Sequence, residues 1–165
     1  MSLRFYDRRS FLLGAGSAGA ALVGGPLMSI SPLLAAGAFA PTETMPGGAN
    51  NYRPGAPLVE RLGTGFVVSG RVLKAGDGTP LKGQRIQIWA ATTVGSEPDP
   101  RNHGSVLTAA DGTFRLEMPQ IVPSLGQPHA HLAYDDKAFK TVFLRPLLGK
   151  ATDTSLSVDF VLAPA

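Results

Sequence analysis

Short runs of alternating or β-branched hydrophobic residues, separated by turn residues, fill the chain from about position 65 onward. Residues 85–91 show the pattern most clearly, because Ile86 and Ile88 share one face while Gln87 and Trp89 share the other. No part of this region has the apolar period of a helix of ordinary length. The pattern predicts about seven strands, at 66–73, 85–91, 106–108, 113–118, 129–133, 140–144 and 156–162.

Turn residues between these runs indicate reversals of the chain. Gly76-Asp77-Gly78 and Asp111-Gly112 both favour hairpins, and the totals of 20 glycines and 14 prolines agree with many turns. Many short strands without helices are typical of an all-β protein, here a single β-sandwich over residues 65–165. Residues 39–64 lack a hydrophobic period and are rich in turn residues, so they predict an extended N-terminal arm.

The first 38 residues have the composition of a signal peptide, with a basic start followed by a run rich in glycine and alanine. Arg8-Arg9-Ser10-Phe11-Leu12 resembles the twin-arginine export signal, in which Arg8, Arg9, Phe11 and Leu12 carry the match. Small residues between Ala36 and Ala40 offer a cleavage site. We therefore expect a periplasmic or secreted protein that uses the twin-arginine export machinery, with an uncleaved N-terminal anchor as the alternative.

The charge is concentrated in that leader. Residues 1–40 hold three arginines and one aspartate, whereas the rest of the chain holds 12 Lys and Arg against 11 Asp and Glu. A nearly neutral mature domain lacks the basic patch that nucleic-acid binding needs, so nucleic acid is not an expected partner.

Two of the three histidines, His129 and His131, lie two positions apart in a predicted strand. Alternate side chains of a strand share a face, with Cα atoms roughly 6.5 Å apart, so the two imidazoles could share one metal ion. The chain has no cysteine, and any metal site must therefore use nitrogen and oxygen ligands. The alternative is an ordinary strand whose two half-buried histidines bond to the backbone.

Four segments, in order, resemble the intradiol ring-cleavage dioxygenases: NNYRPGAPL, VSGRVLKAGDGTPLKGQRIQIWAA, LTAADGTF and QPHAHL. The resemblance runs from about Asn50 to Leu144. It implies a prealbumin-like β-sandwich and a mononuclear non-haem Fe(III) site with two tyrosine and two histidine ligands. It also implies a reaction in which O2 opens a catechol ring between its two hydroxyl-bearing carbons.

The resemblance implies that His129 and His131 are metal ligands, but the two tyrosines do not carry over. Neither 91–105 nor 119–127, where the family has them, contains a tyrosine. Tyr52 lies in the arm, and Tyr134 is at odd spacing from His131 and so faces the other way on a regular strand. A site that keeps only imidazoles suits Cu, Zn or Fe(II) better than Fe(III).

His103 lies in the loop where the first family tyrosine would be. It is a candidate third ligand and a candidate catalytic base, since imidazole titrates near neutral pH; the alternative is a solvated loop residue. Gln127 stands where the family has an arginine before HxH, and with Tyr134 it is a candidate substrate contact. Further oxygen ligands could come from Asp111, Asp135 or Asp136, although Asp111 is more simply a hairpin residue.

These features predict an exported metalloprotein, similar to intradiol dioxygenases, that acts on or binds catechol-type aromatics. The cofactor implied by the resemblance is non-haem iron, with Cu or Zn open because of the histidine-only ligand set. One alternative is a metal- or ligand-binding sandwich that kept the fold and lost ring cleavage, and another is an accessory sandwich without a metal. The sequence leaves the oligomeric state open, a homo-oligomer included.

Overall fold

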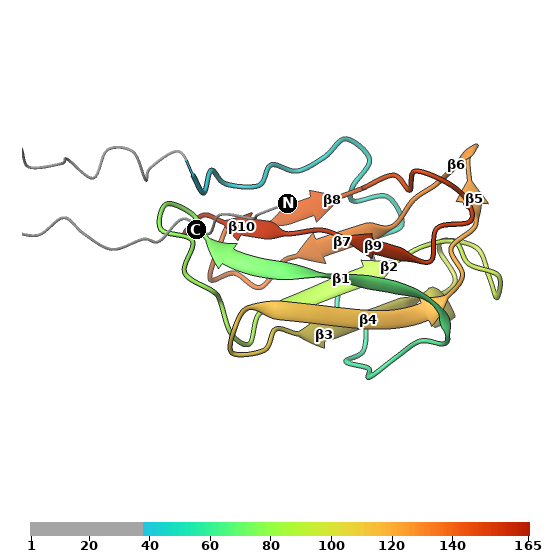
Figure 1. Ribbon diagram of the computed structural model, residues 1–165, viewed down its shortest axis with the longest axis horizontal. Helices are drawn as coiled ribbons and strands as arrows, with labels where there is room; N and C mark the ends of the chain where they lie inside the picture. Colours follow the sequence, from blue (N-terminus) through green and yellow to red (C-terminus); the bar gives the residue numbers. More distant parts are fainter. Residues whose placement is uncertain (1–37) are drawn as a thin grey trace, which may run out of the picture. The chain divides into compact units, whose positions relative to one another are not determined.

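A computed structural model describes residues 38–165, and the expected signal peptide therefore lies almost wholly outside the described residues. Two four-stranded sheets pack as a β-sandwich, as predicted (Figure 1). One sheet has the order β10-β1-β4 with β9 also on β1, and the other has the order β3-β2-β7-β8. The strands of the first are β1 (Gly65–Lys74), β4 (Thr113–Pro119), β9 (Ser155–Ser157) and β10 (Phe160–Leu162). Those of the second are β2 (Arg85–Trp89), β3 (His103–Leu107), β7 (His131–Tyr134) and β8 (Val142–Leu144).

The remaining elements are small. A two-stranded hairpin, β5 (Pro123–Ser124) with β6 (Gln127–Pro128), precedes β7, and a single 3-10 turn, Pro100–Asn102, leads into β3. Among the described residues, no helix has the length and apolar character needed to cross a membrane.

Alternate residues of the strands build the core between the two sheets. Phe66 and Val68 of β1 face inward, as do Ile86 and Ile88 of β2, and all four are fully buried. Burying apolar side chains at this density is the main stabilising contribution to such a domain. The period-2 pattern therefore predicted the inner face of each long strand correctly.

Three strand boundaries differ from the sequence prediction. β3 begins at His103, which the polar character of 92–105 had placed in a loop, and β7 begins at His131, so that His129 makes only an isolated bridge to Leu147. The segment expected as one strand at 156–162 is two strands, both parallel to β1. Val158, which lies between these two strands, approaches β1 closely, since a Cβ on Gly70 would lie 1.7 Å from its carbonyl oxygen.

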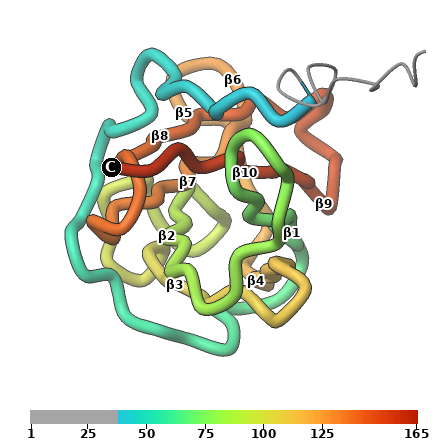
Figure 2. Tube along the Cα trace, turned by 90° about the vertical axis from the view of Figure 1, so that its left-hand side faces the viewer, coloured from blue at the N-terminus to red at the C-terminus, as the bar shows by residue number. Residues whose placement is uncertain are grey.

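The arm, residues 39–64, runs along the second sheet and covers its outer face (Figure 2). Its backbone bonds to both edges of that sheet, from Met45 N to Phe143 O at 2.8 Å and from Val59 N to Ser105 O at 3.0 Å. In between, Trp89 Nε1 donates to the carbonyl oxygen of Asn50 at 3.0 Å. Trp89 is consequently only 1% exposed, although it lies on the face opposite to the core. The arm thus creates a second buried layer, and the candidate site lies in it.

Candidate metal centre

Three aromatic side chains form a row across the outer face of the second sheet. β-Pairing puts Trp89 opposite His103 on one side and opposite His131 on the other. The Trp89 and His131 rings stack with centroids 5.0 Å apart and planes 8° apart, and the Trp89 and His103 rings stack at 5.7 Å and 9°. Such stacking fixes the ring planes of both histidines, because the strand register leaves little freedom.

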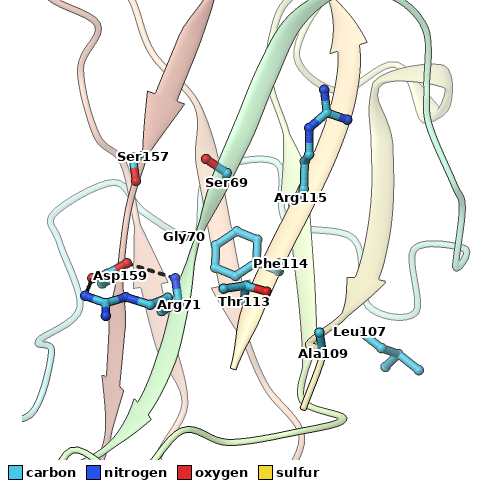
Figure 3. Close-up of a pocket in the computed structure, with 10 residues that line it drawn as sticks. All are labelled: Ser69, Gly70, Arg71, Leu107, Ala109, Thr113, Phe114, Arg115, Ser157 and Asp159. Carbon is cyan, nitrogen blue, oxygen red and sulfur yellow. Dashed lines mark hydrogen bonds and ion pairs between the residues drawn. The ribbon is translucent and has the colours of Figure 1, made fainter. Parts of the chain in front are cut away.

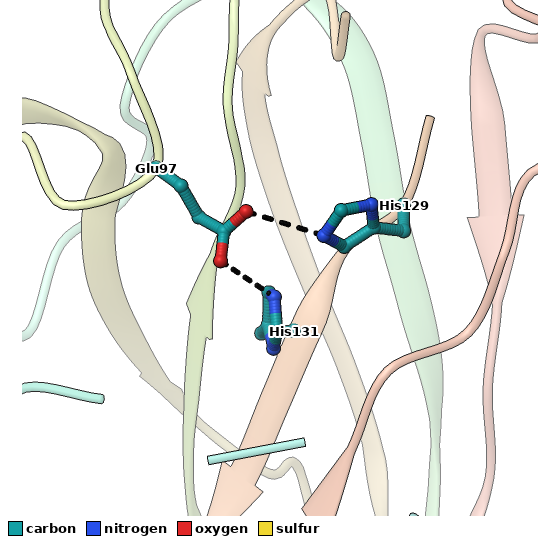
Figure 4. A group of neighbouring side chains, drawn as sticks. All are labelled: Glu97, His129 and His131. Atoms are coloured by element: carbon teal, nitrogen blue, oxygen red, sulfur yellow. Dashed lines mark hydrogen bonds and ion pairs between the residues drawn. The ribbon is translucent and has the colours of Figure 1, made fainter. Parts of the chain in front are cut away.

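Glu97, His129 and His131 converge into one buried group beside this row (Figure 4). Glu97 Oε1 lies 2.9 Å from His131 Nε2, and Glu97 Oε2 lies 3.2 Å from His129 Nε2. One ligand atom from each residue falls within 4.8 Å of the other two. Two ligands at right angles, each about 2.1 Å from a shared ion, would lie about 3.0 Å apart, and each histidine nitrogen is near that distance from one of the two Glu97 oxygens.

The loop before β3 delivers Glu97 to this position. Asn102 is fully buried and donates from Nδ2 to the carbonyl oxygens of Gly95 and Ser96, at 2.8 and 2.9 Å. Thr92 Oγ1 donates to Asn102 Oδ1 at 2.8 Å, which closes the loop from its other end. The loop backbone is therefore held on both sides of Glu97.

Hydrogen bonds at the far side of each imidazole indicate where the protons are. His129 Nδ1 lies 2.8 Å from the carbonyl oxygen of Gln127, and His131 Nδ1 lies 2.9 Å from that of Gly48. A carbonyl oxygen only accepts, so each Nδ1 must carry a proton. In a neutral His131 the lone pair is then on Nε2, which faces Oε1 of Glu97, whereas Nε2 of His129 lies at hydrogen-bond distance, 3.2 Å, from Glu97 Oε2.

Burial favours that neutral form in His131. It lowers the pKa of His131, against the smaller opposing effects of the Gly48 carbonyl and the charge of Glu97. His131 Nε2 is buried and has no hydrogen-bond partner among the described residues, since its contact with Glu97 lacks hydrogen-bond geometry. A lone pair and a carboxylate oxygen at 2.9 Å repel each other unless a cation lies between them. The donor set of the chain therefore fits a metal ion.

Positive charge beside Glu97 favours its carboxylate form. Burial acts to raise its pKa, but the hydrogen bond from Asn51 and positive charge at His131 and His129 outweigh burial, and the pKa lies below its ordinary value. Asn51 Nδ2 donates to Glu97 Oε1 at 2.9 Å. Hydrogen bonds of this kind orient metal-ligating carboxylates.

His103, expected as a third ligand, stands apart from this group. It lies beyond Trp89, and its Nε2 bonds to the backbone oxygen of Glu97 at 2.8 Å. Burial lowers the pKa of His103, which favours its neutral form. Glu97 therefore occupies the place that the sequence suggested for His103, and His103 instead helps to hold the backbone of Glu97.

The other candidate residues lie around the group without joining it. Tyr134 is fully buried on the core face, as its spacing predicted, and its hydroxyl donates to the Asp136 carbonyl. Gln127 is exposed and contributes only its carbonyl oxygen, to His129. The hydroxyl of Tyr52 donates to Asp135 and so does not reach the group either. Asp111 caps its hairpin by accepting from Thr113, as expected of a turn residue.

Sequence reasoning missed Glu97, although a signal was present. Glu97 is the only glutamate between 91 and 105, the loop in which the family resemblance implies an anionic ligand. A carboxylate can supply the negative charge that the missing tyrosine would have supplied.

A separate cavity of about 650 Å³ opens on the outer face of the first sheet (Figure 3). Ser69 and Thr113 line it, and its charged side chains are Arg71, Arg115 and Asp159. Arg71 is paired with Asp159 at 3.1 Å. The cavity holds no histidine and no unpaired carboxylate, so it lacks the donors for metal chemistry, and the candidate site remains the buried group on the other sheet.

No protein-family model matches the chain, and no curated protein matches its sequence. Solved structures do match, and they define the fold as that of intradiol ring-cleavage dioxygenases. Hydroxyquinol 1,2-dioxygenase from Pseudomonas putida DLL-E4 superposes with a TM-score of 0.60 at 16% identity, over 76% of this chain and 67% of that one.

Two further structures support the same fold. The dioxygenase domain of a dioxygenase and carbohydrate-binding protein fusion from Streptomyces sp. SirexAA-E gives a TM-score of 0.56 at 21% identity, over 76% of this chain and 99% of that one. An intradiol ring-cleavage dioxygenase from Tetranychus urticae gives a TM-score of 0.56 at 17% identity, over 68% of this chain and 66% of that one. At identities this low the likeness establishes the fold, and an activity does not follow from a fold alone.

Proposed function

We propose that this chain is a metal-binding protein that holds one non-haem metal ion between Glu97, His129 and His131 and binds catechol-type aromatics at that ion. The observation that carries the proposal is the buried Nε2 of His131, 2.9 Å from a carboxylate oxygen and without a hydrogen-bond partner among the described residues. An unsatisfied buried polar atom is costly, and a cation at this point would satisfy it.

The donor set supports a divalent ion. Two neutral imidazoles and one carboxylate, with further positions open, form the ligand set that is typical of non-haem Fe(II) sites, and they also suit zinc or copper. We propose iron as the ion, in line with the ring-cleaving enzymes that share the fold. When bound, such an ion would supply Lewis acidity toward the two oxygens of a catechol.

The surrounding residues would orient these ligands. The carbonyl oxygens of Gln127 and Gly48 hold Nδ1 of each imidazole, Asn51 holds one oxygen of Glu97, and Trp89 packs on the ring of His131. Neighbours of this kind fix ring orientation and tautomer and raise ligand basicity.

Access to the group is restricted, which bears on activity. Glu97, His129 and His131 are 5%, 2% and 0% exposed, and the arm around Gly48 and Asn51 covers them. A catechol would reach the ion only if this part of the arm moved. No tyrosine of the described residues is available as a base for the second catechol proton. We therefore propose aromatic binding with weak or absent ring cleavage.

A metal-binding sandwich that binds no aromatic is the second candidate, and the same burial favours it. A titration of catechol into iron-loaded and metal-free protein separates the two. The first function requires binding that depends on the metal, together with oxygen uptake slower than ring-cleaving enzymes of this fold show. If fully iron-loaded protein binds no catechol, only the second candidate, a metal-binding sandwich that binds no aromatic, remains.

Export is a further proposal, and it rests on sequence alone. The twin arginines at Arg8 and Arg9, followed by Phe11 and Leu12, support translocation of the folded protein to the periplasm or the medium. A buried metal ion is compatible with this route, because the site could be filled before the protein leaves the cytoplasm.

A further inference from the structure

The part of the arm that covers the metal centre is a short loop between two glycines. Residues 47–55 have the sequence GGANNYRPG, and Gly47 and Gly55 at its ends have positive φ angles, 71° and 74°. Glycine adopts such angles without strain, so the chain can change direction at both ends at little cost. Just outside the glycines, the backbone nitrogens of Met45 and Ala56 bond to the second sheet. The loop can therefore hinge as a unit while the rest of the arm stays in place.

Polar contacts join the loop to the metal ligands. The Gly48 carbonyl oxygen accepts from Nδ1 of His131 at 2.9 Å, and Asn51 Nδ2 donates to Oε1 of Glu97, also at 2.9 Å. Water can replace a backbone carbonyl or a side-chain amide as a partner, so such bonds add little net stability to the closed loop. Something else must hold the loop down.

Tyr52 supplies nearly all of the apolar contact between the loop and the sheet. Within residues 47–55 only Gly48 is buried and only Tyr52 is half-buried, and all the others are exposed. The Tyr52 ring packs on Trp89 and on Phe143, with centroids 5.7 and 4.9 Å apart. Segments with so few buried apolar contacts open locally at a fraction of the free energy of global unfolding. Tyr52 is therefore the main anchor of the loop.

The hydroxyl of Tyr52 adds a polar fastening to this anchor. It donates to one carboxylate oxygen of Asp135, the residue that follows β7. Gln87 Nε2 donates both to the Tyr52 oxygen at 3.0 Å and to the other oxygen of Asp135 at 2.8 Å. Hydrogen bonds to a carboxylate are stronger than those between neutral groups. The three side chains thus tie the loop to β2 and to the end of β7.

We propose that residues 47–55 form a lid over the metal centre, which opens to admit the ion and an aromatic ligand, and that Tyr52 keeps the lid closed. This inference deepens the proposed function and rests on it, because the lid serves the centre beneath it. Opening takes Gly48 and Asn51 away from the ligands and lets solvent reach them. Tyr52 is a positioning residue that acts through the loop, so it governs the rates of entry and exit and not the strength of binding.

The first experiment needs no metal. Trp89, the only tryptophan of the chain, is 1% exposed, and its indole N–H donates to the Asn50 carbonyl oxygen in the loop at 3.0 Å. Exchange of this proton with solvent therefore requires the lid to open, and NMR follows it as a single signal. Tyr52→Phe keeps the ring and removes the hydroxyl. In metal-free mature protein we expect this variant to raise the exchange rate at least about tenfold, the effect of losing a hydrogen bond to a charged group.

Tyr134→Phe is the matched control, because it removes a hydroxyl that bonds to the Asp136 carbonyl outside the loop. It should leave the indole exchange rate unchanged. Asp135→Asn breaks the same fastening as Tyr52→Phe and should also speed exchange, and the double variant should be no faster than the faster single variant. Exchange in Tyr52→Phe as slow as in wild type, or equal acceleration in Tyr134→Phe, would overturn the proposal.

The second experiment separates the lid from the metal centre by measuring zinc kinetics. Zinc uptake and zinc release to excess chelator both pass through the open lid. Tyr52→Phe should therefore speed both by the same factor, at least about tenfold, and leave Kd unchanged, whereas Asn51→Gly should weaken equilibrium binding because it removes a bond to Glu97. Wild-type protein that takes up no zinc would overturn the metal centre and the role of the lid together. Normal zinc affinity with unchanged rates in Tyr52→Phe would overturn the lid alone.

Discussion

Oε1 of Glu97 and Nε2 of His131 lie 2.9 Å apart without forming a hydrogen bond. Both atoms present lone pairs when His131 is neutral, and burial lowers the pKa of His131 toward that form. Two acceptors brought this close inside a protein repel each other strongly, because the low dielectric screens little. The contact becomes favourable when a metal ion accepts both lone pairs.

The hydrogen bond from Asn51 to Glu97 should contribute to metal affinity. Asn51 has a φ of 57°, a backbone conformation that glycine adopts without strain, so Asn51→Gly removes the side chain and leaves the backbone in place. Loss of an interaction that orients a ligand costs about 10- to 100-fold in affinity. Competition titration against a chelating dye should show at least a tenfold loss for zinc.

The neighbouring Asn50→Ala is the matched control, since Asn50 serves Trp89 through its backbone carbonyl. Its metal affinity should equal that of wild type. If Asn51→Gly also binds zinc as tightly as wild type, Asn51 has no part in orienting Glu97.

The iron-loaded protein should lack the visible colour that tyrosinate ligands give to ferric ions. Tyr52 and Tyr134 donate their hydroxyls to Asp135 and to the Asp136 carbonyl, and neither reaches Glu97, His129 or His131. Absorption spectra of protein loaded aerobically with iron would show this directly. A tyrosinate band that disappears in Tyr52→Phe would mean that the arm rearranges to bring Tyr52 to the metal.

The fold itself can be tested at Gly70. A Cβ at this position would lie 1.7 Å from the Val158 carbonyl oxygen, so Gly70→Ala must separate β1 from the junction of β9 and β10. Overpacking of this kind costs about 1–3 kcal/mol in the free energy of unfolding. Urea denaturation of Gly70→Ala and wild type measures this loss of stability.

Gly149→Ala provides the comparison, because a Cβ there would make only an ordinary contact, 3.4 Å from Asp153. That variant should unfold within about 0.5 kcal/mol of wild type, as surface substitutions usually do. Equal stability of the two variants would show that β9 and β10 do not pack against Gly70 as described.

Export is tested by the pair Arg8→Lys and Arg9→Lys. The double variant keeps the positive charge of the leader but removes the arginine pair that the export machinery recognises. Cell fractionation should find the precursor retained in the cytoplasm, whereas the same change at Arg4 should leave export intact. Normal export of the double variant would exclude the twin-arginine route.

The sequence predicted the strands well, and the reason lies in local periodicity. Ile86 and Ile88 alternate with Gln87 and Trp89, and the HxH spacing keeps His129 and His131 close together along the chain. These are properties of neighbouring residues. They do not require knowledge of how distant segments meet.

The third residue of the group, Glu97, could not be predicted from local periodicity. Glu97 reaches His131 through a loop closed by Asn102, and the arm reaches the site through Gly48 and Asn51, at separations that no local pattern encodes. The burial of Trp89 under the arm has the same origin. Such long-range contacts decide which polar residue becomes a ligand, and here they bring in Glu97 and leave His103 beyond Trp89.

The most direct test of the account is the metal content and affinity of mature protein purified without a histidine tag, compared with Glu97→Gln, His131→Ala and the exposed-residue control Glu60→Gln. Wild type and Glu60→Gln should each take up close to one iron or zinc ion per chain. Glu97→Gln and His131→Ala should lose that ion or bind it at least about 100-fold more weakly, because each lacks a direct ligand. Wild-type protein that takes up no metal, or a Glu97→Gln variant that binds as tightly as wild type, would contradict the proposed metal centre.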